Sequence, residues 1–95
     1  MKQVLERTIE NRVVKLAKER WGIISRKMNG MGFNSWPDRM FLIPNGRPLF
    51  IEFKRPGNVV TPDQAALHVR LRSAGYDVSV CDDAEQALII IRALL

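Results

Sequence analysis

The chain has 95 residues, 46% of them hydrophobic, so it can form one domain with a modest core but not two domains. Fifteen lysines and arginines outnumber ten acidic residues, and the net charge of +5 favours a polyanionic partner such as nucleic acid. The single cysteine, Cys81, excludes an internal disulfide framework and cysteine-rich zinc sites.

The sequence shows no signal for export or for membrane insertion. Charges are scattered through residues 1–10, and the longest apolar runs, such as 87–91, fall far short of the ~20 residues that a membrane span needs. We therefore expect a soluble, cytoplasmic protein with a single domain over residues 1–95. Cys81 is expected to be a small core side chain.

The first part of the chain predicts a helix, a short strand and a loop. Apolar residues recur at near-helical spacing over residues 2–20, and Gly22 predicts the end of this amphipathic helix. Residues 23–28 are typical of a short strand. Residues 29–36 contain two glycines and two asparagines, which predicts a mobile loop that leads to Pro37.

A hairpin follows, and its turn decides which side chains meet. A two-residue Asn-Gly turn would need an amide hydrogen that the preceding proline lacks, so we expect a three-residue loop, 44–46. In that loop proline takes the first turn position, asparagine the second and glycine the left-handed bulge position. This register pairs Ile43 with Arg47 and sets Asp38 opposite Glu52, with their Cβ atoms about 5 Å apart on one face.

The second strand of the hairpin has one wholly apolar face and one face that carries charges. Leu49, Ile51 and Phe53 alternate with Phe50, Glu52 and Lys54. Asp38 therefore converges with an acid and a base. Two carboxylates so close repel each other unless a cation joins them, and such hard oxygen ligands suit magnesium or manganese rather than zinc. Lys54 could then orient or deprotonate a water. The alternative is a solvent-facing strand in which Lys54 only neutralises Glu52.

Residues 61–75 predict a second helix with a capping box, in which Thr61 is the N-cap and Gln64 the third helical residue, ended by Gly75. Capping is one sufficient reason for Gln64. His68 is the only histidine and has no partner at metal-ligand spacing, so we expect it on the helix surface or facing DNA. Basic side chains that could contact phosphates are Lys27, Arg55, Arg70 and Arg72, with a solvated basic face as the alternative.

The chain ends with a predicted strand over 77–82 and a closing helix over 82–95, in which Asp83 and Gln86 have capping-box spacing. This helix is apolar nearly all round. A small domain cannot easily bury so many apolar side chains alone, so we expect a two-fold homodimer through Ile89, Ile90, Ile91 or Leu94. Packing of the same residues in the core is the alternative.

Taken together, the helix acid, Pro37-Asp38, the hairpin, Glu52-Phe53-Lys54 and the downstream "TPDQ" resemble the PD-(D/E)XK nuclease superfamily. Within it, the compact order over residues 6–82 is most similar to a stand-alone virus-type replication-repair nuclease (VRR-NUC) domain of the kind found in phages. The resemblance implies an α/β fold in the order α-β-β-β-α-β-α, with a central mixed sheet flanked by helices.

The resemblance also implies roles for particular residues. Asp38 and Glu52 would bind Mg²⁺ or Mn²⁺ together with the backbone carbonyl of Phe53, and Lys54 would position or activate the attacking water. Glu10 would be the helix-borne acid that supports the metal, with Glu6 as the alternative one helical turn away. Gln64 would be an active-site residue.

The expected activity is that of a metal-dependent DNA endonuclease that is encoded by a phage in a bacterial host and is selective for branched DNA such as a four-way junction. Flaps, nicks and plain duplex remain open as substrates. A non-catalytic nucleic-acid-binding or assembly module that retains the nuclease fold is the alternative function.

Overall fold

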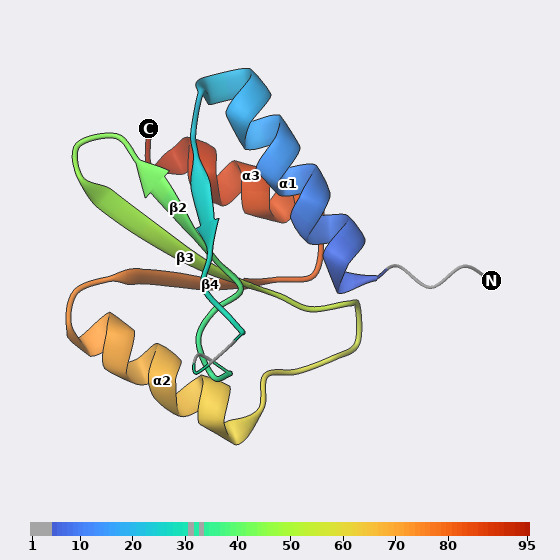
Figure 1. Ribbon diagram of the computed structural model, residues 1–95, viewed down its shortest axis with the longest axis vertical. Coiled ribbons are helices and arrows are strands. Elements are labelled where there is room, and N and C mark those ends of the chain that lie inside the picture. Colours follow the sequence, from blue (N-terminus) through green and yellow to red (C-terminus); the bar gives the residue numbers. More distant parts are fainter. Residues whose placement is uncertain (1–4, 31, 33) are drawn as a thin grey trace.

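The computed structural model describes residues 5–30, 32 and 34–95, in which helices and strands follow the order α1-β1-β2-β3-α2-β4-α3 (Figure 1). The element bounds are α1 Glu6–Trp21, β1 Ser25–Lys27, β2 Arg39–Ile43, β3 Arg47–Phe53, α2 Pro62–Ser73, β4 Asp77–Cys81 and α3 Ala84–Ala93. The predicted order and the α/β class are confirmed. Residues 2–4 of the predicted first helix lie outside the described residues, and the helix begins at Glu6.

The helix ends follow the predicted local chemistry. Gly22 ends α1 with a φ of 67°, a left-handed conformation that glycine adopts without steric cost, and its N–H donates to the carbonyl of Lys18. Thr61 and Gln64 form the full capping box at the start of α2. Asp83 accepts from the backbone N–H of Gln86 at the start of α3.

The hairpin between β2 and β3 has the predicted register. Ile43 pairs with Arg47 across a three-residue turn, and the ladder continues back to Arg39 paired with Ile51. Gly46 has the expected positive φ of 72°. Asn45 also has a φ of 72°, because the short asparagine side chain tolerates the left-handed conformation better than most residues do.

The sheet is mixed, with strand order β1-β2-β3-β4. The first three strands are antiparallel, whereas β3 and β4 are parallel and are connected through α2. Helices α1 and α3 cover one face of the sheet and α2 covers the other (Figure 1). This arrangement places β3 in the interior of the sheet with a helix layer on each side.

The two layers differ in composition. Leu49, Ile51 and Phe53 of β3 point into the larger cluster with α1 and α3, and the fully buried Cys81 joins them, as predicted. Burial and the nearby Asp82 and Asp83 raise the pKa of the Cys81 thiol to about 12. On the other face, Phe50 packs with Leu67, Leu71, Val78, Met28, Trp36 and Met40 in a smaller cluster.

The closing helix buries more of its surface than its composition indicated. Leu88 and Ile91 are buried in the larger cluster, so the prediction that Ile91 could serve an interface is wrong: its side chain faces the sheet. Ile90 and Leu94 are half-buried against the same cluster, and Ile89 is 65% exposed. In the part of the chain that the structure describes, no helix is long and apolar enough to cross a membrane.

Candidate active site

The hairpin brings Asp38 and Glu52 together. Asp38 directly precedes β2, and the next step of the hairpin register beyond Arg39 and Ile51 sets it opposite Glu52. Backbone and loop groups hold its carboxylate: the N–H of Phe53 donates to Oδ2 at 2.7 Å, and the Asn29 side-chain amide donates to Oδ1. Both oxygens of Asp38 are therefore fixed by donors from outside its own strand.

Glu52 is buried under α2, with 3% of its surface exposed, so the solvent-facing strand considered above is wrong. Its neighbours divide between the two carboxylate oxygens. Lys54 Nζ lies 3.7 Å from Oε2, and Gln64 Nε2 donates to the same atom at 3.5 Å. His68 Nε2 lies 4.0 Å from Oε1. The side chain thus sits inside a polar pocket walled by a lysine, an amide and an imidazole.

Burial of these carboxyl groups changes their protonation. Desolvation, followed by repulsion from Asp38, raises the pKa of Glu52 to about 8 although Lys54 opposes the shift. Desolvation also raises the pKa of Asp38, with repulsion from Glu10 and Glu6 adding to it and the hydrogen bond from Phe53 opposing it. Ionising both carboxyl groups at once is therefore costly unless a cation lies between them.

The prediction for His68 is wrong. Its side chain is 2% exposed because α2 turns it toward Glu52 instead of toward solvent. Desolvation lowers the pKa of His68, and the positive charges of Arg72 and Lys54 act in the same direction. A sequence signal existed: His68 stands on the same helical face as Leu67 and Leu71, which pack on the sheet.

Gln64 forms the predicted cap and also contacts Glu52. Its Oε1 accepts from the N–H of Thr61 at 2.9 Å in the capping box, while its Nε2 contacts Glu52. Because the amide has a separate donor and acceptor, one side chain can cap α2 and contact the site at once. Asn29, which had no distinctive spacing in the sequence, was missed.

The helix-borne acids occupy different environments. Glu10 is 4% exposed, and its Oε2 accepts from Arg39 Nε at 2.6 Å and contacts Lys27 Nζ at 3.5 Å. Glu6 is half-buried, and its charge acts on both Asp38 and Glu52. Glu10 is thus paired with two cations, whereas Glu6 forms no such pair among the described residues. The charges of both acids raise the pKa of Asp38, and that of Glu6 also raises the pKa of Glu52.

The four basic residues that were predicted to contact phosphates also differ in their surroundings. Lys27 contacts Glu10, and Arg72 Nη2 donates to the carbonyl of Val78 at 3.0 Å, which ties α2 to β4. Arg55 is exposed just beyond the end of β3. Arg70 is exposed on α2, on the side of the loop that leads to Asp38.

The side chains of the site fit a hard cation that is held by only a few protein ligands. Across residues 5–30, 32 and 34–95, no cluster of three or more His, Cys, Asp or Glu side chains could enclose a metal, so an all-protein cage is absent. Two convergent carboxylates remain, and Glu52 Oε1 and His68 Nε2 are buried there without a hydrogen-bond partner. Magnesium characteristically takes one or two carboxylates and fills its other positions with water and substrate phosphate.

Known proteins resemble this chain over nearly its whole length. Residues 2–85 match the VRR-NUC domain family. A curated relative, "Putative nuclease p44" of Acyrthosiphon pisum secondary endosymbiont phage 1, is 34% identical over 90 residues, which cover 95% of this chain and 96% of the relative. A solved structure of a VRR_NUC domain superposes with a TM-score of 0.72 at 32% identity, covering 92% of this chain and 98% of the other.

Proposed function

Because the chain belongs to the VRR-NUC family, we propose that it is a nuclease that hydrolyses phosphodiester bonds of DNA with Mg²⁺ or Mn²⁺ held between Asp38 and Glu52. The observation that carries this proposal is the buried carboxylate pair. Glu52 Oε1 has no hydrogen-bond partner among the residues that the structure describes, and the pKa of Glu52 is raised to about 8 by burial and by Asp38. A cation would relieve both costs.

The ligands would be one oxygen from each carboxylate and the backbone carbonyl of Phe53. The N–H of Phe53 already donates to Asp38, so the same short segment holds one ligand in place and supplies another. When bound, the cation would polarise the phosphoryl oxygen and stabilise the leaving oxygen. Glu10 would support the site from α1 by fixing Arg39 beside Asp38.

Lys54 is proposed to act on the attacking water. Its side chain is 12% exposed. Lys54 directly follows β3, two residues after Glu52, so the alternation of the strand places both side chains on one face. Nζ is 3.7 Å from Glu52 Oε2, close enough to share a water with that carboxylate. The ammonium can orient this water or, once neutral, accept its proton. Gln64 Nε2, on the same oxygen, would keep Glu52 in this orientation.

A branched DNA substrate and a homodimer complete the proposal. Four-way junctions need paired incisions, which two copies of the chain could make through a shared α3 surface around the exposed Ile89. A non-catalytic DNA-binding module remains the second candidate, but burying two carboxylates and a lysine together would have no purpose in such a module.

Cleavage of end-labelled DNA tests the proposal. Duplex, nicked, flapped and four-way substrates are incubated with magnesium, manganese or chelator, and the size of the protein is measured in parallel. We expect products only with metal. Metal-independent cleavage, or DNA binding without any cleavage under all conditions, would contradict a metal-dependent nuclease.

Lys54→Ala tests the role given to the lysine. We expect cleavage to fall by about 10²-fold or more, the usual contribution of a positioned acid or base, while metal binding persists. Calorimetric titration with Mn²⁺ measures that binding. Arg26→Ala, an exposed cation on β1, is the control and should cleave normally. Normal cleavage by Lys54→Ala would remove the lysine from the mechanism.

A further inference from the structure

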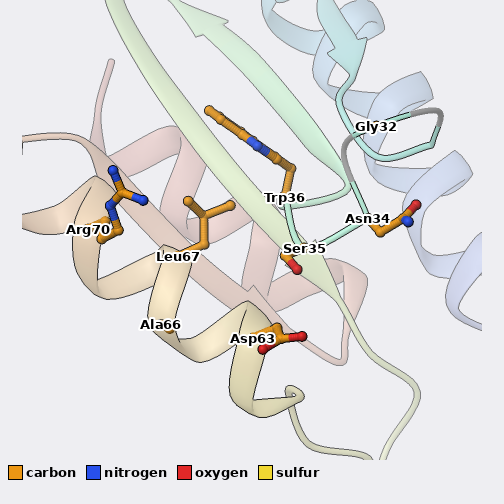
Figure 2. Close-up of a pocket in the computed structure, with 8 residues that line it drawn as sticks. All are labelled: Gly32, Asn34, Ser35, Trp36, Asp63, Ala66, Leu67 and Arg70. Atoms are coloured by element: carbon orange, nitrogen blue, oxygen red, sulfur yellow. The ribbon is translucent and has the colours of Figure 1, made fainter.

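A pocket of about 480 Å³ lies between α2 and the loop that precedes Asp38 (Figure 2). The loop contributes Asn34, Ser35 and Trp36, and α2 contributes Asp63, Leu67 and Arg70. Its volume falls in the range of small-molecule sites, roughly 300–1,000 Å³. None of these side chains belongs to the metal chemistry proposed above, so the pocket needs a separate explanation.

The α2 wall has a polar residue at each end and an apolar residue between them. Asp63, Leu67 and Arg70 are spaced by four and three residues and therefore share one helix face. Leu67 packs in the same cluster as Trp36 and Phe50, which gives the pocket an apolar wall of fixed shape. The remaining lining, Asn34 and Ser35, offers hydrogen-bond donors and acceptors.

Trp36 and Arg70 supply the two features that single-stranded nucleic acid recognises. The indole packs on Phe50 with ring centroids 6.1 Å apart, which fixes its orientation, and it also lines the pocket. Aromatic rings of this kind stack on bases. Arg70 is exposed and forms no ion pair with any residue that the structure describes, so its guanidinium is available for a phosphate.

Both walls of the pocket continue along the chain into the candidate active site. Trp36 is two residues before Asp38 along the loop, and Asp63 directly precedes Gln64, whose Nε2 contacts Glu52 at 3.5 Å. A nucleotide in the pocket would therefore be a neighbour of a phosphate held at the carboxylates.

We propose that this pocket holds one unpaired base of the DNA substrate, stacked on Trp36, with the adjacent phosphate on Arg70. The proposal rests on the nuclease function above and narrows its substrate to DNA with an unpaired nucleotide next to the cleaved bond. A base inside a duplex cannot enter the pocket unless it is first unstacked and unpaired, which costs free energy. For a base that is already unpaired this cost is small.

Binding to matched DNAs without metal tests the proposal independently of cleavage. Three duplexes differ at one position, which carries an unpaired 2-aminopurine, a paired 2-aminopurine or an abasic sugar. We expect the unpaired base to bind about tenfold more tightly than the abasic site, as one stacked base provides. We also expect its fluorescence to be quenched by the indole.

Variants assign the effect to the pocket. Trp36→Leu keeps an apolar contact with Phe50 but should lose the tenfold preference and the quenching, whereas Trp36→Phe should retain both in part. Arg70→Gln should weaken binding to all three DNAs alike. Arg92→Gln, on the exposed surface of α3, is its control and should bind as the unchanged protein does.

Each outcome decides the proposal. Equal binding of unpaired and abasic DNA, or no binding of either, overturns it, as does a preference that survives in Trp36→Leu. Melting curves confirm that each variant is folded. Absence of cleavage with every metal would instead contradict the nuclease proposal and leave the base pocket standing if the binding preference holds.

Discussion

The two faces of strand β3 show how one short segment can serve stability on one side and chemistry on the other. Leu49, Ile51 and Phe53 are 1% exposed or less and pack in the larger apolar cluster beneath α1 and α3. One residue out of phase, Glu52 is buried almost as deeply, but beneath α2 it meets Lys54, Gln64 and His68. Burial is similar, and the partners differ. The first face gains free energy from burial, whereas the second keeps an ionised carboxyl group at a cost that a bound cation would relieve.

Removing charge from the polar face should have the largest effect. Glu52→Gln and Asp38→Asn keep the shape of the site but remove the negative charge that would hold a cation. We expect cleavage to fall by about 10³-fold or more, because a catalytic metal contributes several kcal/mol to the barrier. DNA binding should change little because the phosphate contacts remain. Cleavage assays and binding titrations measure the two quantities.

Glu19→Gln, an exposed carboxylate on α1, is the matched control and should cleave normally. Unchanged cleavage rates in either site variant would rule out the assignment of Asp38 and Glu52 and would break the contrast between the two faces.

Substitutions on the apolar side of the sheet should lower stability and leave cleavage unchanged, the opposite of those at the carboxylate pair. Ile91→Ala empties a fully buried position of α3 and should lower the free energy of unfolding by about 2–5 kcal/mol. Cleavage per folded molecule should be retained, since Ile91 lies across the sheet from the site. Ile89→Ala on the same helix, where the side chain is 65% exposed, should shift stability by only about 0.5 kcal/mol. Denaturant unfolding measures both, and equal losses would contradict the packing described.

The free energy of unfolding should depend on pH through Glu52 on the polar face, and this effect should be smaller than those above. Glu52 has an ordinary pKa of 4.5 and a folded pKa of about 8, so between these values the folded state binds more protons than the unfolded state. The free energy of unfolding should therefore fall as pH rises from 4.5 to about 8. Glu52→Gln should flatten this decline. Above pH 8, with chelator present, its melting temperature should be higher than that of the unchanged protein.

Metal provides the internal check for that experiment. Magnesium should raise the melting temperature of the unchanged protein above pH 8 and leave Glu52→Gln where it was, because a ligand stabilises only the state that binds it. A shift of 1 kcal/mol corresponds to about 4–8 °C in a domain of this size. Parallel pH curves for the two proteins would show that Glu52 is not the group responsible.

The apolar face could be predicted from the sequence, and the polar face only in part. Alternation along residues 49–54 fixes which side chains share a face, and Pro44 excludes the two-residue turn that would have shifted Asp38 to the wrong side. Both are local effects. Burial of His68 depends on how α2 docks on the sheet, and its Nε2 lies 4.0 Å from Glu52 Oε1 across two elements that are distant in sequence. Such placement has no local signature beyond the shared helical face of Leu67 and Leu71.

The smallest change in the stability of the domain is expected for a substitution on the exposed apolar surface of α3. Ile89 is 65% exposed on α3, beside the half-buried Ile90 and Leu94, and this patch is the proposed homodimer contact. Ile89→Asp should leave the fold nearly as stable, because its side chain already meets solvent, yet it should produce a monomer, since a charge cannot be desolvated at an interface without a partner. Sedimentation equilibrium measures the mass, and the monomer should lose paired incision of four-way junctions before it loses cleavage of simpler DNA. Ile91→Asp, two residues further along α3 and fully buried, should instead unfold the chain, which separates an interface effect from a core effect. An unchanged protein that sediments as a monomer at high concentration would refute the dimer while leaving the carboxylate pair, and the chemistry proposed for it, untouched.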